Sequence, residues 1–260
     1  MPETTASGTK IYWEEAGSGD PLLLIMGLGY THQMWHRSLP VMAERYRTIV
    51  FDNRGVGKSD VPPGPYTIAQ MAGDAAAVLD AAGVKRTRVF GISMGGMIAQ
   101  EFALAYPDRV ESLVLGCTAC GGRGAVPAAE NVLQVLKARA TMTPEEGAAA
   151  MVPYIYDSST PRERIEEDLA IRRRTFATAD GYMAQLQAIL AWTSLDRLAG
   201  IHAPTLIIHG ETDELVPPVN AAILASHIPG SRVVMLPNAS HIFITDQPAA
   251  SHREILAFLG

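Results

Sequence analysis

The sequence predicts an α/β protein in which a mostly parallel sheet is flanked by helices and carries a helical insertion. Two observations support this prediction. Six short apolar runs alternate with helical stretches, a pattern typical of parallel sheets that are covered on both faces. The alternation stops between residues 119 and 192, where the chain is helical in character and contains no apolar strand run.

The six apolar runs are bounded by Gly, Pro or Asp and are short enough to be strands buried on both faces. They span residues 22–25, 47–51, 88–92, 113–115, 205–209 and 232–236. Residues 11–15 precede Gly17, Ser18 and Gly19, and we interpret this segment as an antiparallel edge strand followed by a turn.

Helices are expected between these strands, at residues 68–82, 94–106, 218–227 and 249–259. Three more candidate helices, at 130–140, 162–176 and 181–192, lie where no strand run occurs, and Thr143-Pro144 and Thr160-Pro161 resemble helix starts. We therefore predict a core formed by residues 1–118 and 193–260, and a helical insertion (residues 119–192) that caps one end of the sheet.

Composition narrows the class of protein. The chain has 260 residues, 48% of them hydrophobic, and a formal net charge of −6, which argues against nucleic acid or an anionic membrane as partner. No apolar run approaches the ~20 residues of a membrane span. Residues 1–10 are polar and lack the apolar stretch of a signal peptide. We expect a soluble, cytoplasmic protein with no cofactor or metal requirement; the oligomeric state is not predicted.

Two short clusters, one of cysteines and one of arginines, could be functional sites. Cys117 and Cys120 form a Cys-x-x-Cys pair, but no helix clearly starts between them, so a buried strand end and its turn is favoured over a redox pair. No further Cys or His ligands stand nearby at zinc spacing. The basic run 172–174 lies on a predicted helix, where a solvated face is the default and an anion contact the alternative.

Ser93 lies in Gly91-Ile-Ser93-Met-Gly95, between a predicted strand and a predicted helix. This is the nucleophile-elbow arrangement, in which a strained turn lifts a serine hydroxyl clear of the sheet and the flanking positions must be small. The N–H of Met94, at the start of the helix, would favour developing negative charge. The alternative is a Gly-rich turn that holds a structural serine.

A serine hydroxyl needs a base, usually a histidine oriented by an acid, and the elbow topology predicts the order Ser, acid, His. His241 follows the last apolar strand and Asp213 follows the strand at 205–209, so both belong to the carboxyl end of the sheet. Glu211 and Glu214 remain alternatives to Asp213 at this point. His209 is interpreted as a structural residue at a strand end.

The chain resembles the α/β-hydrolase family over roughly residues 10–260. The resemblance rests on Gly91-Ile-Ser93-Met-Gly95, His209-Gly-Glu-Thr-Asp213, Ser240-His241 and the Asp-x-Arg-Gly-x-Gly-x-Ser signature at 52–59. It implies an eight-stranded sheet with a cap after the sixth strand, Ser93 as nucleophile, His241 as base and Asp213 as the orienting acid. It also implies an oxyanion hole of the Leu28 and Met94 N–H groups, although Met26-Gly27 replaces the usual His-Gly.

The resulting expectation is a serine hydrolase that cleaves a small carboxylic ester or lactone through an acyl-enzyme. Two alternatives remain: hydrolysis of a C–C bond or cofactor-free perhydrolysis by the same triad, and a ligand-binding receptor of the same fold. The cap side chains either cover the site or pack with one another, and Met97 is interpreted as core. The cap side chains in question are Met142, Met151, Tyr154, Tyr156, Tyr182 and Met183.

Overall fold

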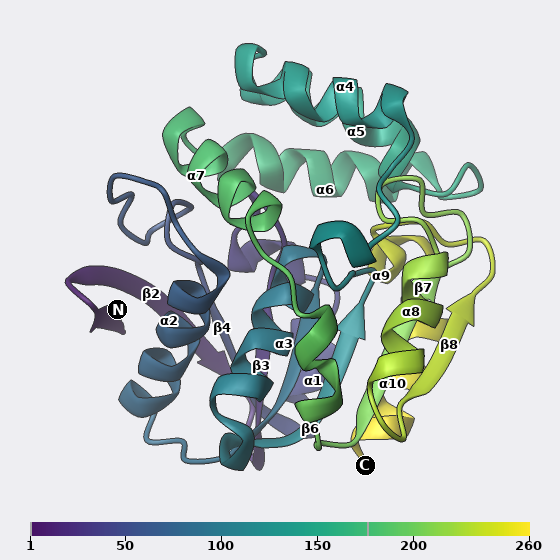
Figure 1. Ribbon diagram of the computed structural model, residues 1–260. Coiled ribbons are helices and arrows are strands. Elements are labelled where there is room, and N and C mark those ends of the chain that lie inside the picture. Colours follow the sequence, from purple (N-terminus) through teal and green to yellow (C-terminus); the bar gives the residue numbers. More distant parts are fainter. Residues whose placement is uncertain (1, 176) are drawn as a thin grey trace.

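The computed structural model describes residues 2–175 and 177–260, and its sheet has eight strands, as predicted (Figure 1). The order across the sheet is β1-β2-β4-β3-β5-β6-β7-β8. The strands are β1 (Glu3–Ala6), β2 (Thr9–Ala16), β3 (Asp20–Ile25), β4 (Tyr46–Phe51), β5 (Thr87–Ile92), β6 (Val110–Gly116), β7 (Thr205–Gly210) and β8 (Arg232–Leu236).

The six apolar runs all fall within strands of this sheet, and β3 to β8 pair in parallel. Residues 11–15 belong to β2, which is antiparallel to β4 as expected. The prediction that this strand is the edge is wrong, because β1 pairs outside it. β1 is short and has only one buried side chain, Ala6, so it lacks the apolar run that revealed the other strands.

Helices cover both faces of the sheet. The longer ones outside the insertion are α2 (Ile68–Ala81), α3 (Met94–Ala105), α8 (Val219–His227) and α10 (Pro248–Leu259); α1 (Leu39–Ala43) and α9 (Phe243–Asp246) are short. Short 3₁₀ helices lie at η1 (His32–Trp35), η2 (Pro107–Arg109), η3 (Gly122–Gly124), η4 (Arg139–Thr141) and η5 (Leu195–Gly200).

Alternate side chains of each strand point to opposite faces of the sheet and pack into two apolar layers. Leu23 and Ile25 of β3 pack into one layer with α2, α3 and α8, whereas Leu22 and Leu24 pack into the other with α1 and α10. Strands buried on both faces require such continuous apolar runs, because every side chain along them meets a helix. The expectation of burial on both faces is wrong for β8, an edge strand in which Arg232 and Val233 are exposed. The parallel arrangement then brings the carboxyl ends of β3 and β5 to β8 to one edge.

Residues 119–192 are helical, as predicted, and α4 to α7 lie together beyond one end of the sheet (Figure 1). These helices are α4 (Glu130–Ala138), α5 (Pro144–Ile155), α6 (Arg162–Arg174) and α7 (Ala179–Leu190). Residue 176, at the end of the predicted helix 162–176, lies outside the described residues. The division into a core and a capping domain stays a prediction.

Two buried side chains of the insertion bind the rest of the chain. Gln185 of α7 donates from Nε2 to the carbonyl oxygen of Arg54 at 2.8 Å, and its Oε1 accepts the N–H of Gly29 at 2.9 Å. Asp168 of α6 accepts the hydroxyl of Thr245 at 2.7 Å. Both side chains are fully buried, so breaking these contacts would leave unpaired polar groups.

Candidate active site

Ser93 lies on the sharp turn between β5 and α3. Its backbone has φ 58° and ψ −123°, a conformation that costs a non-glycine residue on the order of 1–3 kcal/mol. The surroundings hold it there: its N–H donates to Gly116 O at 2.9 Å, and its carbonyl oxygen accepts the Thr118 hydroxyl at 2.7 Å. The strained turn and the partly exposed side chain match the elbow that the sequence predicts.

Neighbouring glycines make this turn possible. A Cβ atom on Gly91 would lie 2.2 Å from Gly95 O, and one on Gly95 would lie 2.0 Å from Ile25 O. A third glycine, Gly96, is equally confined, because its Cβ would meet the Thr118 side chain at 2.6 Å. The motif in the sequence points to the first two only; Gly96 and Thr118 become visible once β6 lies beside the elbow.

His241 and Asp213 are hydrogen-bonded to each other. The distance from His241 Nδ1 to Asp213 Oδ2 is 2.8 Å, and both side chains are buried. The other carboxylate oxygen of Asp213 accepts the N–H groups of Leu215 and Val216 at 2.9 and 2.8 Å. Glu211 and Glu214 are exposed, so the structure favours Asp213 as the partner of His241.

The charge on Asp213 is stabilised from two sides. Burial alone would raise the pKa of this carboxyl, but the positive charge available on His241 and hydrogen bonds from His209 and His241 hold the pKa well below its usual range. His209 Nε2 lies 3.4 Å from the carboxylate and 2.8 Å from Val216 O. His209 lies at the end of β7, as predicted, but no pattern in the sequence indicates its contact with Asp213.

A cavity of about 230 Å³ brings four of the five predicted residues together: Ser93, His241, Leu28 and Met94 line it. Asp213 lies behind His241 instead. No hydrogen bond joins Ser93 to His241 in the described part of the chain, which is common in unliganded sites whose contacts tighten on substrate binding. The rest of the lining is mainly apolar and includes Met26, Ile92, Met97, Met151, Ile155 and Leu186.

The loop after β3 lies directly against the elbow. A Cβ on Gly27 would be 3.1 Å from Ser93 Cβ, so a small residue is needed there. Asn53 fixes the preceding carbonyl by donating from Nδ2 to Met26 O at 3.0 Å. Within the described residues, the N–H groups of Leu28 and Met94 donate no hydrogen bond to the protein. Two such donors beside one serine can receive an oxyanion.

The cap side chains named above divide among several places. Met151 lines the cavity around Ser93, and Met142 and Tyr182 line a second, smaller cavity. Tyr156 is buried and hydrogen-bonded to Asp168, while Tyr154 and Met183 line neither cavity. The interpretation of Met97 as core is incomplete, because this side chain belongs to the apolar layer and also forms part of the cavity wall.

Cys117 and Cys120 are free, buried thiols that follow the end of β6, as the favoured interpretation predicts. Burial raises the pKa of both, the opposite of what a reactive pair needs. Cys117 Sγ lies within 4.8 Å of donor atoms of His209 and Asp213, a spacing that could hold a metal ion. Asp213 and His209 Nε2 already take part in the hydrogen bonds described above.

A second carboxylate stabilises the loop that carries His241. Asp246 Oδ2 accepts the N–H of Ser240 at 2.7 Å, and its Oδ1 accepts the Thr160 hydroxyl at 2.6 Å. No motif in the sequence marks Asp246. The residue stands in α9, and only the fold brings it beneath the Ser240 backbone.

Comparisons with known proteins agree with this fold. A family model described as the alpha/beta hydrolase fold matches residues 20–248. A relative from Azorhizobium caulinodans, named "Putative carbamate hydrolase RutD", is 32% identical, covering 100% of this chain and 98% of its own. The enol-lactonase structure of Burkholderia xenovorans LB400 is 29% identical with a TM-score of 0.88, over 99% of both chains.

A thermophilic esterase of Thermogutta terrifontis is also 29% identical, with a TM-score of 0.87 over 99% of this chain and 97% of its own. In the described residues 2–175 and 177–260, no helix combines the length and apolar character that a membrane crossing needs. The relatives are named as hydrolases, an esterase and a lactonase among them, and the chain belongs to the α/β-hydrolase family.

Proposed function

We propose that this protein is a serine hydrolase that cleaves a small carboxylic ester or lactone. The observation that carries the proposal is the His241–Asp213 hydrogen bond of 2.8 Å beside a cavity that also exposes Ser93 on a strained elbow. A buried, ionised carboxylate holds the imidazole in one tautomer, with Nε2 available as a base. The esterase and lactonase among the relatives support the same substrate class.

In the first half of the reaction, His241 accepts the Ser93 proton as the hydroxyl oxygen attacks the carbonyl carbon. The N–H groups of Leu28 and Met94 donate to the resulting oxyanion, and each such donor is worth ~2.7–4 kcal/mol in a comparable site. Protonated His241 then gives its proton to the leaving oxygen, and the acyl group remains on Ser93.

In the second half, water attacks the acyl-enzyme while His241 again serves as base. The acid product leaves and Ser93 regains its proton. Throughout both halves Asp213 stays ionised, since its pKa is held well below the usual range. For a lactone the leaving oxygen stays attached to the acyl group, so a single hydroxy acid is released.

The test combines a fluorophosphonate probe with a series of p-nitrophenyl esters from acetate to octanoate. Ser93→Ala should lose labelling and turnover while staying folded. Ser226→Ala is the matched control, because Ser226 is an exposed serine of α8 whose hydroxyl bonds only to its own helical turn. The labelled peptide is located by mass spectrometry, and the chain-length profile gives the size of the acyl site.

Ester hydrolysis that persists in folded Ser93→Ala would overturn the proposed nucleophile. Labelling at Ser93 without ester or lactone turnover would favour C–C bond hydrolysis or perhydrolysis. Slow turnover with tight product retention would favour a receptor.

A further inference from the structure

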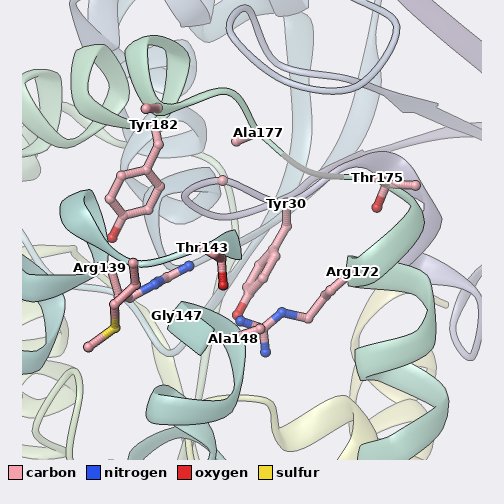
Figure 2. Close-up of a pocket in the computed structure, with 12 residues that line it drawn as sticks. Tyr30, Arg139, Thr143, Gly147, Ala148, Arg172, Thr175, Ala177 and Tyr182 are labelled. Carbon is pink, nitrogen blue, oxygen red and sulfur yellow. The ribbon is translucent and has the colours of Figure 1, made fainter. Parts of the chain in front are cut away.

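A second cavity, of about 130 Å³, lies between the helical insertion and the loop after β3, which contributes Gly29 and Tyr30 to its lining (Figure 2). Arg139 of η4 and Arg172 of α6 approach it from opposite sides, Arg139 beside the ring of Tyr182 and Arg172 beside the ring of Tyr30 (Figure 2). None of the 12 residues that line it is acidic. The cavity therefore combines two cationic groups with no anionic one.

Arg172 is the unusual member of this site. Only 5% of the residue is exposed, and neither Nη1 nor Nη2 has a hydrogen-bond partner among the described residues. Arg173 and Arg174 beside it are exposed. The expectation of a solvated face for 172–174 is thus wrong for Arg172, because the helix turns this side chain inward. Buried guanidinium groups are normally paired, since desolvating an unpaired charge is costly.

The nearest carboxylate in sequence does not neutralise it. Asp168 stands one helical turn before Arg172, but its Oδ2 already accepts the hydroxyls of Tyr156 and Thr245. Its Oδ1 lies 3.4 Å from His36 Nε2 and 3.5 Å from Arg37. The charge of Asp168 is thus directed away from the cavity, and the guanidinium of Arg172 keeps its donors free for a ligand.

Aromatic rings hold both guanidinium groups in place. The Arg172 group lies 4.8 Å from the centre of the Tyr30 ring, and the Arg139 group lies 4.8 Å from the centre of the Tyr182 ring. Stacking on a ring orients a guanidinium while leaving its N–H edge available for a planar, bidentate acceptor. The Tyr182 hydroxyl is also buried without a partner among the described residues.

This cationic cavity adjoins the cavity around Ser93. Tyr30 and Arg139 line both of them, so the two cavities share part of their wall. The apolar cavity around Ser93 accepts a hydrocarbon chain, and the guanidinium groups lie beyond it. The arrangement matches a molecule with a reactive carbonyl in one part and an anionic group in another.

We propose that Arg172, assisted by Arg139, binds a carboxylate of the substrate, so that the preferred substrates are esters or lactones that carry a free carboxylate remote from the scissile bond. A carboxylate suits the small cavity and the planar donor edge of Arg172. This inference rests on the proposed function, because it assigns a substrate class to the same reaction.

The experiment compares p-nitrophenyl monoesters of dicarboxylic acids, from succinate to suberate, with p-nitrophenyl esters of fatty acids of equal length. Wild type should prefer the carboxylated ester at one chain length. Arg172→Met should lower kcat/KM for that ester by about tenfold or more, as expected for loss of a charge-assisted hydrogen bond. Turnover of the neutral esters should change little. Arg174→Met, an exposed arginine of the same helix, is the control.

Inhibition by free dicarboxylates is a second measurement. It tests carboxylate binding whether the substrate carries its carboxylate on the acyl side or on the alcohol side of the scissile bond. These compounds should inhibit neutral-ester hydrolysis by wild type competitively, and inhibit Arg172→Met about tenfold less. Equal inhibition of both proteins, or an equal loss on charged and neutral esters in Arg172→Met, would overturn the carboxylate site. Neutral-ester turnover that depends on Ser93 would still support the proposed function in that case.

Discussion

Nδ1 of His241 lies 2.8 Å from Oδ2 of Asp213, and the second oxygen of this carboxylate is held by two backbone N–H groups. Asp213→Asn should therefore keep the fold but present an amide to His241, which disfavours the productive tautomer. We expect kcat for a neutral ester to fall by on the order of 10³–10⁴-fold, by analogy with serine proteases. Glu214→Gln, an exposed neighbour, should leave kcat unchanged. A variant Asp213→Asn that retained a tenth of the activity would contradict the assigned role.

Gly95→Ala should prevent folding or strongly destabilise the protein, because its Cβ would lie 2.0 Å from Ile25 O. Gly73→Ala is the matched control, since nothing lies within 4 Å of a Cβ at this helical position in α2. Replacing a helical glycine with alanine typically adds about 1 kcal/mol to the free energy of unfolding. Soluble expression and urea unfolding of the two variants measure the contrast. A Gly95→Ala protein as stable as wild type would show that the elbow can relax.

Asp74→Ala should lower the free energy of unfolding by about 3–5 kcal/mol, because it leaves a buried guanidinium unpaired. Asp74 accepts two hydrogen bonds from Arg54, at 2.6 and 2.7 Å, and both residues are buried. Asp80→Ala provides the comparison on the same helix. Its ion pair with Arg109 is largely exposed on the Asp80 side, and such pairs contribute about 0–1 kcal/mol. Similar losses in the two variants would refute this account of the buried pair.

Asp246 should make stability depend on pH. Burial raises the pKa of this carboxyl from 3.8 to about 6, outweighing the hydrogen bonds from Thr160 and Ser240. Between these values the unfolded chain loses its proton while the folded chain keeps it. The contribution of this group to the free energy of unfolding is therefore fully present at low pH and is lost as pH rises to about 6.

Asp246→Asn removes that dependence. The free energy of unfolding of Asp246→Asn relative to wild type should rise by roughly 2–3 kcal/mol between about pH 4 and pH 6. Urea unfolding across this pH range measures the difference, with the exposed Asp108→Asn as control. A difference that does not vary with pH would show that Asp246 titrates normally in the folded protein.

Much of the fold could be predicted from the sequence because local pattern and burial agree there. The six strands that pair in parallel each contain a short apolar run, and Gly91 and Gly95 mark the elbow. β1 escaped the prediction because a peripheral strand with one buried residue has no distinctive pattern. Because β1 was not predicted, β2 was wrongly expected to be the edge strand of the sheet.

The predicted site residues come together where the order of strands would place them, but their surroundings depend on tertiary contacts. Thr118 acts on the elbow from the neighbouring strand end, and Asp246 acts on the loop of His241 from α9. The burial of Arg172 could not be predicted from the sequence for another reason. Three successive arginines resemble a solvated face, and only the packing of α6 separates the buried one from its exposed neighbours.

The buried hydrogen bonds of Gln185 and Asp168 also indicate which parts of the insertion can change during evolution. They hold α7 and α6 through buried hydrogen bonds, whereas in the described part of the chain α4 makes no buried hydrogen bond to the core. Yet α4 contributes Leu133, Leu136 and Lys137 to the wall of the cavity around Ser93. Substitutions at these three positions can therefore change the shape of that wall without breaking a buried hydrogen bond to the core, which makes them one route by which the substrate range could change.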